Sequence, residues 1–252
     1  TRRARIDHYG RYMRQLLPSP VDDVDPFEIY PSAPRPRPAG RPWLMLNMIA
    51  SVDGAVAVDG VSAGLGGAGD REVFGAVRAS ADWVLVAAGT ARAERYGRPR
   101  ARAAGRAPGL AVLSGSLDLA LDLPMLTAAA DGARPLVLTG ESPPADRLEA
   151  LSEVAEVVSL PGARPHPRDV LGALSDRGAE VVLGEGGPTL NGQLVGAGLV
   201  DELCVSFSPL LVGGASSRIA RGAGAAEAGP TPLRLEHLLE ADHMLFARYV
   251  RR

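Results

Sequence analysis

EVVLGEGGPTLNGQLVGAGLVDELCVSFSPLLVGG, residues 180–214, is the stretch that decides the fold. EVVL is a short apolar run with β-branched residues, which is typical of a buried strand. The glycine-rich turn at 184–187 follows it, and Pro188 stands where proline favours the first turn of a helix. A second apolar run, ELCVSFS at 202–208, closes the segment. The stretch therefore predicts a strand, a tight turn, a helix and a further strand, as in an α/β protein.

The rest of the chain continues this alternation. Further apolar runs predict strands at 43–50, 83–88, 110–114, 135–139 and 156–160, and amphipathic stretches predict helices at 70–81, 145–152 and 167–177. The tail, PLRLEHLLEADHMLFARYV at 232–250, alternates apolar and polar residues, which indicates an antiparallel pair. We therefore expect an α/β fold with a mainly parallel central sheet flanked by helices, and with antiparallel strands at its C-terminal end.

Residues 1–41 depart from this pattern and are interpreted as a proline-rich N-terminal arm. Within it, YGRYMRQLLPSP at 9–20 is expected to form a short helix. YPSAPRPRPAGRP at 30–42 shows no periodicity, which favours an extended crossing segment. Residues 42–252 are then expected to form a single domain.

Composition excludes several kinds of chemistry. The chain contains no lysine, so all 27 basic residues are arginine, and Schiff bases, pyridoxal phosphate anchors and Walker A lysines are ruled out. The formal charge of −2 gives no electrostatic footprint for nucleic acid. Cys204 is the only cysteine, which excludes an internal disulfide and suits a cytoplasmic protein. The histidines lack metal-ligand spacing, so no metal site is expected, and no apolar run of roughly 18 residues predicts a membrane span.

Two glycine-rich turns compete for a phosphate-binding role. GLGGAG at 64–69 matches the dinucleotide pattern GxGxxG, with Asp82 near the place of the ribose-binding acid, but a broken, half-polar segment precedes it instead of a buried strand. GEGGPT at 184–189 has a predicted strand before it and a predicted helix after it. Its backbone N–H groups and the helix dipole favour an anion such as a pyrophosphate. The alternative is a tight strand-to-helix connection that binds nothing.

Two further sites carry polar residues beside predicted strands. AAGT at 87–90 follows a strand as GEGG does, and the alternative there is that Thr90 is simply a helix N-cap. Asn47, Ser51 and Asp53 form a polar cluster, with Asn47 inside an apolar strand where an amide needs hydrogen-bond partners. The cluster would give a floor for a polar ring or a sugar, and the alternative is a satisfied core amide followed by a turn.

Three blocks, LNMIASVDGAV at 46–56, GDREVFGAVRASADWVLVAAGT at 69–90 and the stretch from 181 to 214, lie in this order along the chain. Together they resemble the reductase domain of riboflavin biosynthesis, in the dihydrofolate-reductase-like pyrimidine reductase family. The resemblance implies that fold and an NADPH-dependent reduction of 5-amino-6-(5-phosphoribosylamino)uracil to its ribitylamino product. Hydride would pass to C1′ of the opened ribose. A homodimer with a small-molecule substrate, and with no nucleic-acid or membrane partner, is also implied.

The resemblance carries roles over to particular residues. It implies that Glu185 and Asp53 are catalytic. The implied cofactor contacts are Asp70, Ala87, Ala88, Gly89, Thr90, Thr139, Gly184, Glu185, Gly186 and Gly187. The implied substrate contacts are Asn47, Ser51, Asp53 and Arg78, with Arg78 available for the substrate phosphate or for a structural surface role. Arg92 or Arg95, just after the 87–90 turn, would suit the 2′-phosphate of NADPH.

The chain departs from the family pattern at two positions. Many members have lysine directly after the S-x-D-G segment, where this chain has Ala55, and some have lysine at the position of Asn47. A reductase of the same fold acting on another pterin-like or carbonyl substrate is therefore an alternative, and a non-catalytic nucleotide-binding protein is another. The zinc deaminase that is fused to some members needs a cysteine pair that Cys204 alone cannot supply, so we expect the reductase alone.

Overall fold

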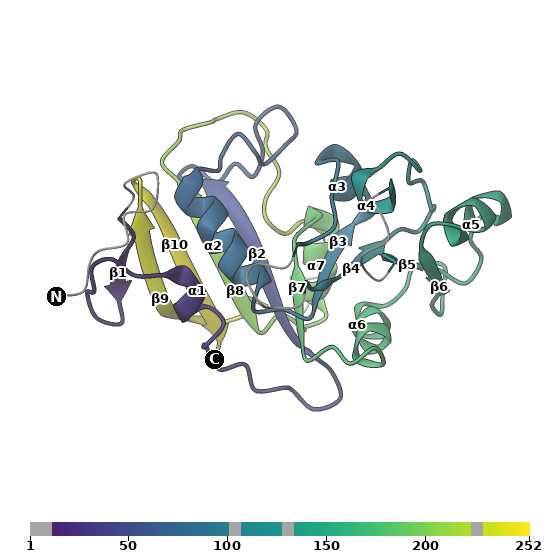
Figure 1. Ribbon diagram of the computed structural model, residues 1–252, viewed down its shortest axis with the longest axis horizontal. Helices are drawn as coiled ribbons and strands as arrows, with labels where there is room; N and C mark the ends of the chain where they lie inside the picture. The colour runs from purple at the N-terminus through teal and green to yellow at the C-terminus, as the bar shows by residue number, and fades with distance from the viewer. Residues whose placement is uncertain (1–11, 101–106, 128–133, 223–228) are drawn as a thin grey trace.

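The structure, a computed structural model, describes residues 12–100, 107–127, 134–222 and 229–252. Seven of its strands run parallel to one another: β2 (Trp43–Ser51), β3 (Trp83–Ala87), β4 (Gly109–Leu113), β5 (Leu136–Thr139), β6 (Glu156–Ser159), β7 (Val181–Gly184) and β8 (Glu202–Ser208). Three more extend the sheet in antiparallel fashion: β1 (Arg14–Leu17), β9 (Leu233–Ala241) and β10 (Met244–Arg251). The order across the ten-stranded sheet is β1-β9-β10-β8-β2-β7-β3-β4-β5-β6 (Figure 1). The predicted α/β class, the strands and the terminal antiparallel pair are confirmed.

Helices cover both faces of the sheet. They are α1 (Pro26–Ile29), α2 (Ala68–Arg78), α3 (Ala88–Ala93), α4 (Pro124–Thr127), α5 (Ala145–Ser152), α6 (Pro167–Ser175) and α7 (Pro188–Gly196). One apolar core lies on the face of α2 to α5, where Val73 and Val77 of α2 are buried. A second core lies on the other face, where Leu171 of α6 and Leu194 of α7 are buried. None of the helices in the described ranges has the length and apolar character that a bilayer crossing requires.

The predicted helix at 9–20 is wrong wherever the chain is described. Arg14–Leu17 is instead the edge strand β1, and it pairs antiparallel with β9. The free backbone groups along the outer edge of β9 need partners, and this short segment supplies them. The first residues of that stretch, 9–11, lie outside the described residues.

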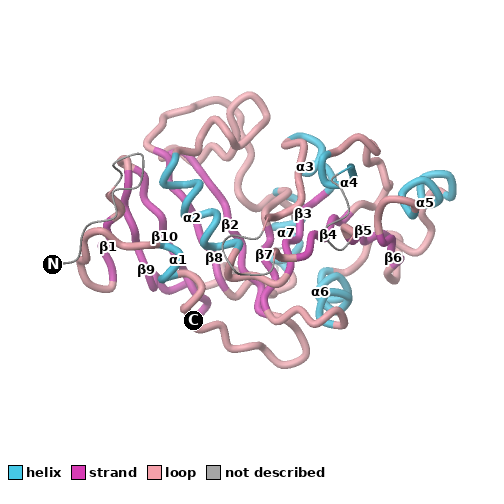
Figure 2. The backbone as a smooth tube through the Cα atoms, viewed as in Figure 1, coloured by secondary structure: helices cyan, strands magenta, loops and turns pink. Residues whose placement is uncertain are grey.

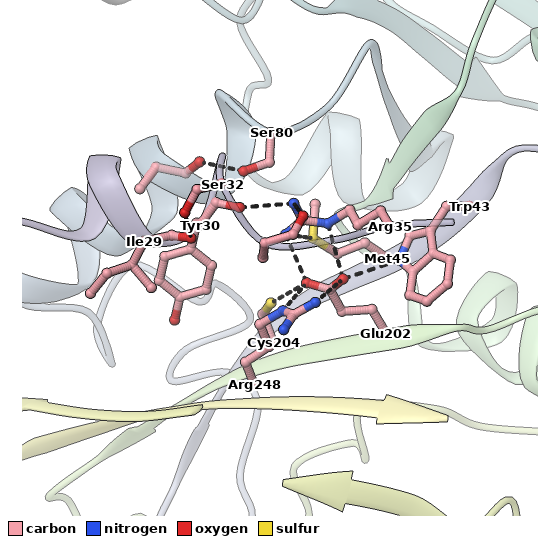
Figure 3. Close-up of polar contacts among 12 residues, drawn as sticks. Ile29, Tyr30, Ser32, Arg35, Trp43, Met45, Ser80, Glu202, Cys204 and Arg248 are labelled. Carbon is pink, nitrogen blue, oxygen red and sulfur yellow. Dashed lines mark hydrogen bonds and ion pairs between the residues drawn. The ribbon is translucent and has the colours of Figure 1, made fainter. Parts of the chain in front are cut away.

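Two consecutive acids at the start of β8 fix the rest of the arm (Figure 3). Glu202 is fully buried and accepts hydrogen bonds from Arg35 of the arm, at 2.9 and 3.0 Å, and from Arg248 of β10, at 2.8 and 3.1 Å. The indole N–H of Trp43 donates to it as well, at 3.0 Å. Asp201 binds both terminal nitrogens of Arg41, at 2.5 and 2.7 Å. The described part of the arm therefore packs into the same body as the sheet.

The glycine-rich segment at 64–69 lacks the strand-turn-helix context of a dinucleotide-binding turn. An irregular loop, not a strand, leads into it, and its last residues begin α2. Gly69 lets this helix approach the sheet, because a Cβ there would lie 3.1 Å from that of Ala241. Asp82 lies before β3 and accepts hydrogen bonds from the backbone of Glu180 and Val181, at the opposite end of the strands from the turns.

Candidate active site

The candidate site lies at the point in the sheet where the helices that follow neighbouring strands pack on opposite faces. Strand β7 is followed by α7 on one face of the sheet, whereas its neighbours β2 and β3 are followed by α2 and α3 on the other. A crevice forms at the carboxyl ends of such strands, and α/β proteins bind ligands there. A cavity of about 1620 Å³ opens at this position. Long loops that follow β2 and β8 rise beside it (Figure 2).

The two turns that sequence analysis selected meet at this crevice. The N–H of Glu185 donates to the carbonyl of Leu85, and the N–H of Ala87 donates to the carbonyl of Gly186. Gly186 and Gly187 have φ of +104° and +75°, which favours glycine. A Cβ on Gly187 would lie 2.5 Å from that of Ala87, so the contact also requires glycine on steric grounds. The backbone of both turns is thereby exposed to one cavity.

The alternative, that Thr90 is a helix N-cap, is wrong. Helix α3 begins at Ala88, directly after β3, and Ala87 occupies the N-cap position without a side-chain bond. Gly89 and Thr90 therefore lie in the first turn of the helix, where they line the cavity with Gly186 and Gly187. Three other predicted cofactor contacts, Ala87, Ala88 and Gly184, lie behind this wall and do not line the cavity.

Glu185 and Arg78 form an ion pair at the cavity wall. The Nε of Arg78 donates to Oε1 of Glu185 at 2.7 Å, and its Nη2 donates to Oε2 at 2.6 Å. The Glu185 side chain is only 3% exposed. Burial raises the pKa of Glu185, and the hydrogen bonds and charge of Arg78 oppose that rise. Removing Arg78 from the pair would leave a buried carboxylate without a partner, at a cost of about 3–5 kcal/mol.

Two aromatic residues complete the surroundings of Arg78. Its guanidinium carbon lies 4.1 Å from the centroid of the Phe74 ring and 5.6 Å from that of the Tyr96 ring. Its Nη2 also donates to the Tyr96 hydroxyl at 2.8 Å. Phe74 comes from the same helix face one turn earlier, a spacing visible in the sequence. Tyr96 follows α3 in a loop that carries no motif, and sequence analysis did not select it.

Asp70 and Asn47 lie on the same side of the sheet as this pair. Asp70, in the first turn of α2, lines the cavity. Burial raises the pKa of Asp70, and the hydrogen bond with Ser206 and the charge of Arg71 offset only part of that rise. Asn47 pairs in register with Cys204 of β8 and also lines the cavity. The cavity therefore brings together eight of the predicted site residues: Asn47, Asp70, Arg78, Gly89, Thr90, Glu185, Gly186 and Gly187.

Asp53 and Ser51 are separated from that group. They line a second cavity of about 860 Å³, which shares Gly213 and Ser216 with the first. Asp53 accepts hydrogen bonds from the backbone N–H groups of Val212 and Gly213, at 3.2 and 2.7 Å, and from the hydroxyl of Ser51. These bonds, with Ser51 as the largest contribution, lower the pKa of Asp53 to about 2. The carboxylate thus holds two loops together.

Three more predicted contacts lie away from the cavity. Thr139 is fully buried at the end of β5, and its hydroxyl has no partner among the described residues. Arg92 donates to the backbone of Asp118 at 2.6 Å, and Arg95 lies 3.7 Å from Asp122. Neither arginine lines the cavity. The reason is geometric, because both point toward the loop before α4 that carries Asp118 and Asp122.

Several residues that line the cavity were not predicted. Glu94 accepts the backbone N–H of Ser62 at 2.8 Å, and Arg98 donates to the carbonyl of Met125 at 2.8 Å. Arg71 and Arg100 lie on the same wall. These side chains come from loops and exposed helix positions, and only the run of arginines after the 87–90 turn gave a signal that basic residues gather here.

Comparisons with known proteins identify the family of the chain. The family model described as the RibD C-terminal domain matches residues 42–245. A 2,5-diamino-6-ribosylamino-4(3H)-pyrimidinone 5′-phosphate reductase from Methanothermobacter thermautotrophicus is 31% identical over 179 residues, covering 71% of this chain and 82% of the relative. The riboflavin biosynthesis protein RibD of Bacillus amyloliquefaciens is 33% identical over 181 residues, covering 69% of this chain and 47% of that longer protein.

Solved structures share the fold. A pyrimidine reductase-like protein from Corynebacterium diphtheriae superposes with a TM-score of 0.77 at 26% identity, covering 91% of this chain and 99% of the other. The Saccharomyces cerevisiae riboflavin biosynthesis reductase Rib7 has the same fold, with a TM-score of 0.67 at 15% identity over 90% and 97% of the two chains. The dihydrofolate-reductase-like fold and the resemblance carried by the three sequence blocks are confirmed. The chain belongs to the RibD C-terminal domain family.

Proposed function

We propose that this chain is a reductase of riboflavin biosynthesis that uses NADPH to reduce a phosphoribosylaminopyrimidine to its ribitylamino product. The observation that carries the proposal is the cavity at the crossover point. It joins two glycine turns, suited to an anionic cofactor, with the buried carboxylate of Glu185 and the amide of Asn47. A hydride transfer of this kind requires chiefly that two ligands be oriented and water excluded. The relatives named above support the reaction class.

The residues present fit a dinucleotide. The close approach of Gly187 to Ala87 brings the two turns together, and Gly89, Gly186 and Gly187 line the cavity without side chains. Helix α7 begins at Pro188 directly after Gly187, so its N–H groups and the positive end of its dipole lie at the same wall. Gly89, Thr90, Gly186 and Gly187 would hold the pyrophosphate, and NADPH supplies the hydride when bound. Arg92 and Arg95 do not line the cavity, whereas Arg98 and Arg100 do, so one of the latter two would bind the 2′-phosphate.

On the substrate side, Glu185 and Asn47 offer an acceptor and an amide at the floor of the cavity. Glu185 orients a hydroxyl or amine of the opened sugar, and Asn47 offers both a donor and an acceptor to the pyrimidine or ribose. The family lysines are absent at Asn47 and Ala55, and Ala55 is buried, so no cation stands at either position. The substrate phosphate is left to Arg71, Arg98 or Arg100, the arginines of this wall that have no carboxylate partner in the described structure.

The experiment measures NADPH consumption by the purified protein with 5-amino-6-(5-phosphoribosylamino)uracil, and compares the wild type with Glu185→Gln. The substitution keeps size and most hydrogen bonding but removes the charge, so kcat is expected to fall about a hundredfold while the affinity for NADPH changes little. Unchanged turnover would remove Glu185 from the mechanism. A wild-type protein that binds NADPH tightly but reduces no tested substrate would instead be a non-catalytic nucleotide-binding protein.

A second candidate substrate is favoured by the archaeal relatives, whose names specify 2,5-diamino-6-ribosylamino-4(3H)-pyrimidinone 5′-phosphate. It differs from the uracil at the pyrimidine 2-position, so the two compounds share the ribose chemistry. Parallel kcat/KM measurements on both, with NADPH and NADH, identify the substrate and the cofactor. A reductase of the same fold acting on another carbonyl compound would show turnover only outside this pair.

The proposal includes a homodimer located in the cytoplasm. Leu203 and Phe207 of β8 pair in register with Tyr249 and Leu245 of β10, so their side chains share one face of the sheet. Leu245 is 38% exposed and the other three are half-buried, which leaves an apolar face that a second copy of the chain would cover. Light scattering measures the mass in solution and tests this. The cytoplasm suits the single buried, unpaired Cys204.

A further inference from the structure

The side chain that would meet the substrate, Glu185, does not stand alone in the cavity. Both of its oxygens accept hydrogen bonds from Arg78, in a parallel two-point contact at 2.6 and 2.7 Å. A planar guanidinium paired in this way fixes the plane of the carboxylate as well as its position. Each carboxylate oxygen retains a second lone pair, and those lone pairs remain available on the cavity side.

Arg78 is in turn held by two aromatic side chains, Phe74 and Tyr96. Phe74 of α2 lies against one face of the guanidinium, and the Tyr96 hydroxyl accepts from its Nη2. Tyr96 is itself fixed by its backbone, since its N–H donates to Ala91 in α3 and its carbonyl accepts from Met125 in α4. The hydroxyl of Tyr96 acts as acceptor in this contact, so its own proton is not used by it.

We propose that Arg78, Phe74 and Tyr96 form a clamp of positioning residues that holds the Glu185 carboxylate in one orientation as a hydrogen-bond acceptor for the substrate. This clamp rests on one part of the proposed function, namely that the Glu185 carboxylate contacts the substrate. It changes the expected role of Arg78, because an arginine whose fork is filled by a buried carboxylate is not the anchor for the substrate phosphate. It also assigns a role to Tyr96, whose hydroxyl proton is a donor that the clamp can present to a ligand.

Other charged groups around the cavity do not share in the clamp. Asp59, Asp70, Glu94, Arg71, Arg98 and Arg100 line the same cavity. Within the described residues, none of them forms a hydrogen bond or an ion pair with Glu185. The ionisation of Glu185 therefore depends on Arg78 before any other side chain, and this dependence can be measured.

The test compares Arg78→Gln, Arg78→Lys and Tyr96→Phe with the wild type. Arg147→Gln is the matched control for the arginine, because Arg147 lies on α5 and forms an exposed ion pair with Asp118. Tyr12→Phe is the control for the tyrosine, because Tyr12 is exposed. Three quantities are measured: kcat and KM with and without the 5′-phosphate on the substrate, the pH profile of kcat/KM, and the carbon NMR titration of the Glu185 carboxyl, assigned with Glu185→Gln.

Arg78→Gln is expected to raise the pKa of the Glu185 carboxyl further, because burial is then no longer opposed. The acid limb of kcat/KM should move with it, and kcat should fall about a hundredfold. Arg78→Lys should recover part of the loss, since it restores the charge without the fork. Tyr96→Phe should lower kcat about tenfold. The controls should match the wild type.

The proposal is overturned if Arg78→Gln leaves kcat and the Glu185 titration unchanged and raises KM only for the phosphorylated substrate. Arg78 would then be the phosphate anchor. If the wild type reduces neither pyrimidine but the NMR titration still moves in Arg78→Gln, the clamp stands and the proposed function fails. If Tyr96→Phe behaves as Tyr12→Phe does in all three measurements, Tyr96 has no part in the clamp and that assignment falls.

Discussion

At the scale of single residues, Asp53 ties two loops together at the edge of the sheet. Its carboxylate accepts from the backbone of Val212 and Gly213, and Ser216 in the same loop accepts from the backbone of Val56 at 3.1 Å. We predict that Asp53→Asn, which keeps the size but loses the charge, loosens this connection. Hydrogen exchange at the amides of Val212 and Gly213 should accelerate, while global stability changes little because Asp53 is exposed.

The hydrogen bonds that join these two loops depend on pH, because they require the charged carboxylate of Asp53. The pKa of Asp53 is lowered to about 2 from an ordinary value of 3.8, so the folded form favours the charged carboxylate. The contacts are complete above pH 3.8 and are lost as pH falls toward 2. Asp146→Asn, an exposed acid on α5, is the control. Equal exchange rates in Asp53→Asn and the wild type would contradict the role of Asp53 as a connector.

At the scale of elements, His237 links strand β9 to the edge strand β1. Its Nε2 lies 2.8 Å from the side-chain oxygen of Gln15, and burial, followed by the charge of Arg248, lowers its pKa to about 4 from 6.5. Between pH 6.5 and 4 the unfolded chain therefore takes up a proton that the folded chain does not, so stability should fall as pH falls through this window.

His237→Gln tests this prediction, because glutamine can also donate to Gln15 and does not titrate. Thermal unfolding is measured from pH 7 to pH 4 for both proteins. The wild type should lose more of its melting temperature over this range than the variant does. Identical slopes would show that protonation of His237 does not contribute to stability.

The elements that sequence patterns predicted are those whose information is local. The parallel strands from β2 to β8 are mostly apolar, and helices α5 and α6 begin at the predicted residues 145 and 167. Strand β1 was predicted as a helix because a four-residue segment carries too little periodicity, and its conformation is set by the edge of β9. The start of α3 was misplaced because the strand passes directly into the helix, without the capping residue that normally marks the boundary.

At the scale of the whole molecule, the site was predictable where topology alone determines it. The turns at 87–90 and 184–187 follow neighbouring parallel strands, so their meeting could be expected from the strand pattern. The partner of Glu185 could not. Arg78 reaches Glu185, and Phe74 and Tyr96 reach Arg78, only after α2 and the loop behind α3 pack over the sheet. Asp53 was misjudged for the same reason, since its partners lie some 160 residues further along the chain.

The last prediction concerns how the arm is joined to the whole. Glu202 binds Arg35 of the arm and Arg248 of β10 inside the protein, where burial alone would raise its pKa but the hydrogen bond from Arg248 and the two positive charges lower it. Glu202→Ala leaves both guanidiniums buried without a counter-charge. The free energy of unfolding should therefore fall by about 3–5 kcal/mol.

Denaturant unfolding measures that loss, and Glu240→Ala is the control because it removes a partly exposed pair with Arg14, worth no more than about 1 kcal/mol. Hydrogen exchange gives a second readout. Arg35 donates to Glu202 and also to the carbonyl of Tyr30, which accepts the backbone N–H of Ala33. In Glu202→Ala the Ala33 amide should therefore exchange faster than in the wild type, before the rest of the protein unfolds. Losses of equal, small size in the two variants would mean that the arm is held by its apolar contacts, with Tyr30 foremost among them, and not by the charges on Glu202.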